Sequence, residues 1–386
     1  MSLQPTESSS NLPDLLASYA NELAAAQKRL DASAGDLAAL LDLIIQKPTT
    51  RDQICDLLEK SWRHLQTLRE LLQTLGGVKT DSAELIDALT VAHKAIDTDA
   101  SLSLTKLKDA LDAAGDHSKK SPVDSTLQGR LAEANALACC LERDYDGAAK
   151  HYQSAAVLSE QDQDKDAQWR YKSLQAAALC DLGRESLDDH RLSDAVALFE
   201  AIASELTNET DDPDKWAKTQ SELGNALGIS GQRQRGTHQL QQAVAVYRKA
   251  LKVQSPEHSP TDWAETQNSL GNALGILAHR QKDVELLEQS QQAFEQALTV
   301  RTQAQHPWDW AATQNNLGSV LQALGQQKND PQLLKRAVEA YKQVLLAWTR
   351  DQAPLHWATT FNNLGTALRL LGEKRKGPRT LEQAVA

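Results

Sequence analysis

One tryptophan recurs at a constant interval in the C-terminal half of the chain, and this repeat constrains the fold more than any other feature. Trp216, Trp263, Trp310 and Trp357 each lie 47 residues apart, and each opens a similar segment such as WAATQNNLGSVLQALG. Trp169, another 47 residues upstream, opens a weaker copy, WRYKSLQAAALCDLG. Such a chain is expected to stack one structural unit several times, because each unit buries its apolar face only against its neighbours.

Each repeat is predicted to contain two helices. The first helix is expected at about 216–229, 263–277, 310–324 and 357–371, where apolar and small residues fall at helical spacing. A glycine recurs inside this helix at Gly224, Gly271, Gly318 and Gly365, although glycine costs about 1 kcal/mol there relative to alanine. Its recurrence predicts that another group packs against the bare backbone. The second helix carries an aromatic residue, Tyr247, Phe294 or Tyr341.

This pattern resembles the tetratricopeptide repeat, in which Leu-Gly in the first helix is followed by small and aromatic residues in the second. Here Leu223-Gly224 is followed by Ala243, Tyr247 and Ala250, and the third copy has Leu317-Gly318, Ala337, Tyr341 and Val344. The usual period is about 34 residues, so the chain looks like the long-period bacterial arrays and is somewhat similar to kinesin light chain repeats. The family's tryptophan position in the first helix instead holds Gln220, Gln267, Gln314 or Phe361.

The resemblance and the periodicity together predict an all-α protein. We expect a right-handed α-solenoid of tetratricopeptide-like helix pairs, preceded by an N-terminal helical hairpin or bundle. The predicted domains are a disordered lead-in over 1–11, the N-terminal helices over 12–118, a degenerate first repeat over 122–168 and the solenoid over 169–386.

The N-terminal helices rest on apolar residues spaced three and four apart from Leu12 to Ile44, with one full heptad step, and again from Ile54 to Leu75. One interpretation is a bundle that caps the solenoid, and the other is a module for self-association or partner recruitment. The last copy stops at RTLEQAVA, before its aromatic position. Terminal repeats normally carry a polar capping helix, so we expect the chain to be a fragment that has lost further repeats or another domain.

Composition and charge exclude several classes of function. The formal net charge of −11 argues against binding nucleic acid or an anionic membrane. No apolar run reaches the roughly 18 residues of a transmembrane helix, and the N-terminus lacks the features of a secretory signal. The four cysteines form no C-x-x-C pair and are expected to be small buried hydrophobic residues in a reducing cytoplasm.

No catalytic motif is found, so the chain is not expected to be an enzyme. It lacks a Walker A loop, a dinucleotide-binding glycine fingerprint, a G-x-S-x-G elbow and an H-E-x-x-H motif. His258, His306 and His356 stand at different distances from their tryptophans, which argues against a repeated metal site. We therefore expect no cofactor and no metal.

Recurring asparagines in the first helix are the main candidates for partner contacts. In tetratricopeptide proteins this helix lines the concave groove, and the resemblance implies that such asparagines hold the backbone of an extended peptide. A carboxamide offers both a donor and an acceptor. The alternative is that the asparagines tie neighbouring helices together. The seven candidates are Asn225, Asn268, Asn272, Asn315, Asn316, Asn362 and Asn363.

Two further repeated features were considered for binding. A basic rim is predicted in the turns between the two helices, and it is interpreted as solvated loop charge, a surface for an acidic partner or an edge where two solenoids pack. Its members are Arg233, Arg235, Arg280, Lys282, Lys328, Lys374, Arg375 and Lys376. The row of tryptophans is expected to be structural, with each ring wedged against the preceding repeat.

The function predicted from the sequence is therefore that of a non-enzymatic scaffold for protein–protein interaction, which binds a peptide or a partner helix in the concave groove. The alternative is a sensor or regulatory module of a larger bacterial signalling or defence protein, whose effector is a missing domain or a separate chain. Self-association through the N-terminal helices is a further expectation, whereas membrane and nucleic acid are not expected partners.

Overall fold

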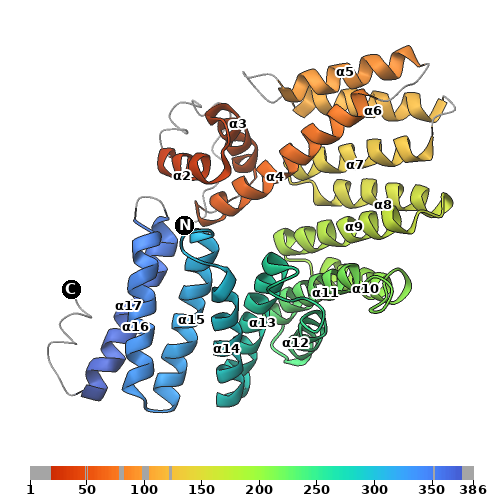
Figure 1. The fold of residues 1–386 in the computed structure, drawn as a ribbon. Coiled ribbons are helices and arrows are strands. Elements are labelled where there is room, and N and C mark those ends of the chain that lie inside the picture. The colour runs from red at the N-terminus through yellow and green to blue at the C-terminus, as the bar shows by residue number, and fades with distance from the viewer. Residues whose placement is uncertain are drawn as a thin grey trace. The chain divides into compact units, whose positions relative to one another are not determined.

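The computed structural model describes residues 19–47, 49, 51–77, 82–97, 104–120, 124–350 and 353–375. Every regular element in these residues is an α-helix, and they contain no strand, which confirms the predicted all-α class (Figure 1). The predicted lead-in over 1–11 and the end of the last repeat, with Lys376, lie outside the described residues. The chain divides into two compact units, 1–198 and 199–386, with the boundary inside α10 (Asp189–Glu205). The domain limits proposed from the sequence remain predictions.

The N-terminal unit consists of helices that pack mainly against their neighbours in sequence. They are α2 (Ala20–Leu30), α3 (Ala34–Ile45), α4 (Arg51–Gly76), α5 (Ala83–Asp97), α6 (Leu104–Lys120), α7 (Ser125–Leu141), α8 (Tyr145–Gln161) and α9 (Lys165–Ser186). The long α4 contacts α2, α3, α5 and α7. Its apolar stripe forms part of the core, and the buried members are Ile54, Leu58, Leu65, Leu68, Leu72 and Leu75.

The first apolar run of the sequence forms two helices rather than one. Asp31 adopts a left-handed conformation with φ of 50° and ends α2. The Ser33 hydroxyl then accepts a hydrogen bond of 3.0 Å from the backbone N–H of Asp36 and caps α3. The break falls within the single heptad step of the apolar pattern, between Leu30 and Leu37.

A buried arginine in the turn between α7 and α8 connects distant segments of the N-terminal unit. Arg143 has φ of 56° and is 7% exposed. Its Nη1 donates to the backbone oxygen of Ile44 at 3.1 Å and to Oγ1 of Thr49 at 2.7 Å. Its Nε forms an ion pair of 2.7 Å with Glu185 in α9. Since a buried guanidinium must have its donors satisfied, these contacts fix α3, α8 and α9 around one residue.

The C-terminal unit alternates the two helices of each repeat, here called the A and B helices. The A helices are α11 (Pro213–Arg233), α13 (Pro260–Gln281), α15 (Pro307–Gln327) and α17 (Pro354–Arg375). The B helices are α12 (His238–Ala250), α14 (Val284–Val300) and α16 (Pro331–Ala347). α13 and α15 each pack against the B helices before and after them, and successive A helices also contact one another (Figure 1). The A helices thus form a continuous row.

Each A helix begins three residues before its tryptophan, earlier than the sequence predicts. Pro213, Pro260 and Pro307 occupy the first turn of their helices, upstream of the starts predicted at the tryptophans. Proline suits this position because its fixed φ is helical and its missing N–H would have no partner within the helix. The tryptophan N–H groups therefore make helical hydrogen bonds, as in the bond of 2.8 Å from Trp310 to the oxygen of His306.

The recurring tryptophans are packed inside the unit where the array is complete on both sides. Trp263 and Trp310 are 7% and 9% exposed. Trp310 belongs to a cluster with Val344 and Trp348, and the partly buried Leu298 of the preceding B helix packs against this cluster. The structural role expected for these two tryptophans is confirmed, whereas Trp216 and Trp357 are half-buried.

The recurring glycine of each A helix faces the aromatic ring of its own B helix. A Cβ built on Gly224 would lie 2.5 Å from the ring of Tyr247, and one on Gly271 would lie 2.8 Å from Phe294. On Gly318 it would lie 2.7 Å from Tyr341. These distances are too short for any real carbon contact, so the bare backbone allows the ring to lie against the helix. The close packing predicted from the glycine is confirmed.

We expect Gly224→Ala to destabilise the protein by about 1–3 kcal/mol, because the added methyl group overpacks the contact with Tyr247. Alanine's better helix propensity, worth about 1 kcal/mol, offsets only part of this. Gly228, one turn further along α11, is the matched control, since its added Cβ would meet only the Tyr247 hydroxyl at 3.6 Å. Gly228→Ala should be neutral or stabilising. Urea unfolding measures both, and equal effects would contradict the packing argument.

Candidate functional site

Residues 47 apart form rows across the A helices, and one of these rows links each repeat to the next. The buried row contains Thr219, Thr266, Thr313 and Thr360, which are at most 2% exposed. The row two residues further along contains Ser221, Asn268, Asn315 and Asn362 and is called here the linking row. The hydroxyls of Thr266, Thr313 and Thr360 each reach the linking-row residue of the preceding A helix.

The same interaction occurs at three successive junctions. Ser221 and Thr266 lie 2.9 Å apart, and the Thr313 hydroxyl donates to Oδ1 of Asn268 at 3.1 Å. The Thr360 hydroxyl donates to Oδ1 of Asn315 at 3.2 Å. Because a serine makes this contact as well as an asparagine does, the contact itself does not require a carboxamide.

In the linking row, the amide oxygens of Asn268 and Asn315 accept hydrogen bonds, whereas in the described part of the chain their amide nitrogens do not donate any. Within the described residues, Nδ2 of Asn268 and Nδ2 of Asn315 have no hydrogen-bond partner, and both side chains are half-exposed. Asn362 is exposed. Each of these amides therefore presents donors on the accessible side of the A helices while its oxygen, in the first two cases, contacts the next repeat.

A second row contains Asn225, Asn272, Ser319 and Thr366, and the B-helix aromatic residue controls its hydrogen bonds. The Tyr247 hydroxyl donates to Oδ1 of Asn225 at 2.8 Å. Burial raises the pKa of Tyr247 well above the usual tyrosine range, so this hydroxyl stays protonated and remains a donor. The Tyr341 hydroxyl makes the matching bond of 3.1 Å to Ser319.

The repeat with phenylalanine breaks this rule. Phe294 has no hydroxyl, and Asn272 instead accepts a hydrogen bond of 3.1 Å from Nδ2 of Asn316 in the next A helix. Asn316 and Asn363 belong to a third row and are half-exposed. The structure thus brings Asn272 and Asn316 together, and it places the seven candidate asparagines on A helices without joining them in one cluster.

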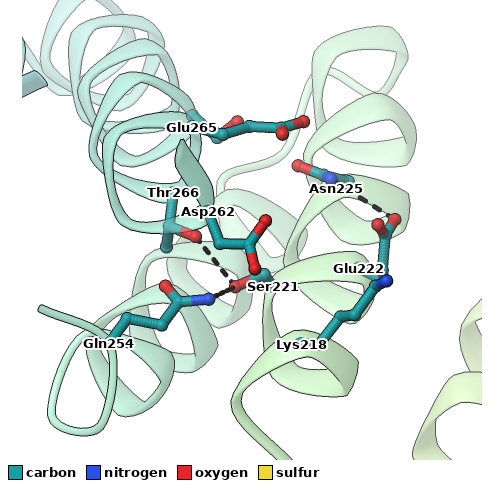
Figure 2. A pocket seen from close by; sticks show the side chains of 9 residues that line it. Lys218, Ser221, Glu222, Asn225, Gln254, Asp262, Glu265 and Thr266 are labelled. Atoms are coloured by element: carbon teal, nitrogen blue, oxygen red, sulfur yellow. Dashed lines mark hydrogen bonds between the residues drawn. The ribbon is translucent and has the colours of Figure 1, made fainter. Parts of the chain in front are cut away.

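A polar cavity lies between α11 and α13 (Figure 2). Its volume is about 30 Å³, and it opens to solvent. Asn225 is the only candidate asparagine that lines it. The full lining is Lys218, Ser221, Glu222, Asn225, Gln254, Asp262, Glu265, Thr266 and Ser269.

Sequence reasoning did not select Gln254 or Glu265 as site residues. The signal that could have identified Gln254 is its variability between repeats. The aligned position holds Arg301 and Trp348 in the following two repeats. A search for recurring residues passes over such a position.

The predicted basic rim is partly used within the chain. Nη1 of Arg280 donates to the backbone oxygens of Gly231 at 2.7 Å and Gly236 at 2.6 Å, and Nη2 donates to Gln232 at 3.0 Å. Lys328 forms an ion pair with Glu288 of the preceding B helix. These two side chains connect neighbouring repeats, and their charged groups are already bound to backbone oxygens or to a carboxylate of the same chain.

The other members of the rim differ in exposure. Arg233 is half-buried and has an interaction within the chain. The side chain of Arg375 and all of Lys376 lie outside the described residues. The exposed members are Arg235, Lys282 and Lys374. Binding of an acidic partner by this rim stays a prediction.

We expect Arg280→Ala to lower the free energy of unfolding by about 1–3 kcal/mol, since charged hydrogen bonds to carbonyls at the end of α11 are lost. Arg280→Lys should recover little, because one ammonium group cannot reproduce the two-pronged contact. Arg235→Ala is the control and should change stability by less than about 0.5 kcal/mol. Chemical unfolding of the three variants distinguishes a structural arginine from a solvated one, for which Arg280→Ala would match the control.

Membrane-spanning helices, metal sites and reactive thiols each have their own structural requirements. No helix in the described part of the chain combines the length and apolar character needed to cross a bilayer. Among the described residues, no group of three or more His, Cys, Asp or Glu side chains is placed to hold a metal ion. Burial raises the pKa of Cys139 to about 11 and that of Cys140 to about 12, which keeps both thiols protonated and unreactive.

Comparison with known families identifies the repeats. The sequence model of the family described as tetratricopeptide repeat matches residues 216–259 and 310–347. These segments cover the first and third A–B pairs of the C-terminal unit, from one recurring tryptophan onward. These two segments of the C-terminal unit are thus of the tetratricopeptide type, which confirms the resemblance drawn from the sequence. A comparison with curated protein sequences finds no match.

Several solved structures are similar to the chain at low sequence identity. The nearly identical TPR-like repeats of a Podosopora anserina protein assigned as a kinesin light chain are 22% identical, with 56% of this chain and 94% of that chain covered and a TM-score of 0.37. BtubC (BKLC) from P. vanneervenii is 20% identical over 63% of this chain and 89% of that one, with a TM-score of 0.40. The apo quorum sensor NprR from B. thuringiensis is 14% identical over 96% and 99%, with a TM-score of 0.42.

Proposed function

We propose that the protein is a non-enzymatic interaction scaffold whose row of A helices binds an extended peptide or a partner helix. The observation that carries the proposal is the linking row, in which Asn268 and Asn315 keep unpartnered amide donors on the accessible side of the A helices. The family resemblance implies that this helix lines the groove of the array. The repeated donors then follow the A helices at the period of the repeat.

Carboxamides suit such a role for a physical reason. An extended peptide exposes one N–H donor and one C=O acceptor per residue, and an amide side chain can satisfy either group without reading the peptide's sequence. Asparagine is a mediocre helix former. Since Ser221 makes the same contact between repeats as Asn268, the asparagines carry polar groups beyond those that stability of the junction requires.

The test separates the amide from the contact between repeats. In the amide variant, Asn268, Asn315 and Asn362 are all changed to serine, which keeps the hydrogen bond to threonine as Ser221 does. In the control variant, Thr313→Val and Thr360→Val remove that bond and leave the amides in place. Both proteins are used to recover partners from a lysate of the native host, with binding quantified against the wild type.

We expect the amide variant to lose at least about tenfold in partner affinity, equivalent to two or three hydrogen bonds of about 0.5–1.5 kcal/mol each. The control variant should bind as the wild type does, at a somewhat lower melting temperature. Full partner recovery by a folded amide variant would refute groove binding through these asparagines. Equal losses in both variants would assign the residues to stability alone.

A further inference from the structure

Helix α5 of the N-terminal unit has one side that other helices do not cover. It packs against α4 and α6 (Figure 1), and its buried residues fall three or four apart on one face, namely Leu85, Leu89, Ala92 and Ile96. The opposite side is exposed and carries Ile86, Asp87, Thr90, Val91 and Lys94. Ile86 is 48% exposed although it is a large aliphatic residue. The helix therefore presents apolar surface to solvent between charged side chains.

A hollow of about 310 Å³ lies beside Ile86, between the last turns of α4 and the middle of α5. It is roughly ten times as large as the polar cavity between α11 and α13. Buried leucines form its apolar part, namely Leu72, Leu75 and Leu89. The rest of the lining is Gln73, Gly76, Ile86, Thr90 and His93. Filling such a hollow with an aliphatic side chain removes apolar surface from water and is therefore favourable.

The exposed side chain and the hollow lie on the same patch, which is what an interface between two identical copies requires. In a two-fold interface both copies use the same surface, so that surface must offer a projection and a matching recess. Ile86 is the projection, and the hollow extends along α5 from Ile86 to His93. Ile86 cannot fill the hollow of its own copy, because it already forms part of the wall.

The charges on the exposed side of α5 favour an antiparallel arrangement of two copies. Asp87 lies three residues before Thr90 and Lys94 lies four residues after it, and both are exposed. If two α5 helices pack antiparallel with the two-fold axis beside Thr90, Asp87 of each copy lies next to Lys94 of the other. Ile86 then reaches the end of the other hollow, which His93 lines. A parallel arrangement would instead bring like charges together, which is costly.

We propose that the exposed side of α5 is a homodimer interface, in which two copies of the chain pack α5 antiparallel and each inserts Ile86 into the hollow of the other. A second copy is the occupant because the projection, the hollow and the opposite charges match one another under a two-fold rotation. The sequence led us to expect self-association through the N-terminal helices, and this patch provides a surface for it. The A helices of the C-terminal unit take no part, so the dimer is independent of the proposed function.

Sedimentation velocity of the full chain over a range of concentrations tests the dimer directly. We expect a concentration-dependent dimer for the wild type, and Ile86→Arg should raise its dissociation constant by about tenfold or more because it places a charge at the centre of the interface. Val157→Arg is the matched control, since Val157 in α8 is also 48% exposed and does not line the hollow. It should dimerise as the wild type does. A monomeric wild type, or equal dissociation constants for Ile86→Arg and the wild type, would overturn the proposal.

A charge swap tests the antiparallel pairing. Asp87→Lys alone and Lys94→Asp alone each bring like charges together across the interface, so each should weaken the dimer by about fivefold. The double variant, Asp87→Lys with Lys94→Asp, restores opposite charges and should recover most of the lost affinity. Both residues are exposed, and circular dichroism establishes that each variant is folded. A double variant that dimerises no better than the single variants would contradict the arrangement.

Cross-linking locates the two-fold axis. Thr90→Cys places one thiol of each copy beside the axis, so a short bismaleimide should join two chains of this variant. Val157→Cys and the wild type, in which Cys139, Cys140 and Cys180 are buried, are the controls and should remain uncross-linked. If the protein dimerises while Thr90→Cys cross-links no more than the controls, the dimer uses another surface and the proposal is wrong.

Discussion

The contact between a helical glycine and an aromatic ring sets the geometry of every complete repeat in the C-terminal unit. Gly224, Gly271 and Gly318 offer bare backbone to Tyr247, Phe294 and Tyr341, at distances that no Cβ would permit. The A and B helices can therefore approach more closely than two ordinary helices of the same size. Interiors pack at crystal-like density, so this spacing fixes where all other side chains of the repeat can reach.

The same ring connects the packing to the accessible surface. The hydroxyls of Tyr247 and Tyr341 extend past the glycine and end at Asn225 and Ser319, on the second row of the A helices. Where the ring is Phe294, that hydrogen bond is missing and the amide pairs across the junction instead. A change of one oxygen atom inside the repeat thus alters which polar groups the surface presents.

The sequence predicted the parts of this structure that repeat without variation. The tryptophan period, the glycine and the aromatic residue were enough to predict the helix pairs, the close packing and the family. The starts of the A helices were misplaced because Pro260 and Pro307 look like loop residues in a sequence, although they suit a first helical turn.

The contacts between repeats could not be predicted from the sequence, because they depend on the offset between neighbouring A helices. Thr313 and Asn268 lie 45 residues apart rather than 47, and nothing in a single repeat shows which row faces which. The role of Arg280 was missed for a related reason. Its backbone acceptors, such as Gly231, have no sequence signature, so an arginine that joins two repeats looks like one in a charged loop.

A repeat array separates stability from specificity by position. Residues that recur at every period, such as the glycine and the buried threonine, serve contacts that each junction needs. A position that differs between periods is free of that requirement, because the backbone places it identically whatever its side chain. Gln254, Arg301 and Trp348 share one such place and put a carboxamide, a guanidinium and a buried indole there. Differences among copies therefore mark the positions where side-chain chemistry varies without a change in how the repeats stack.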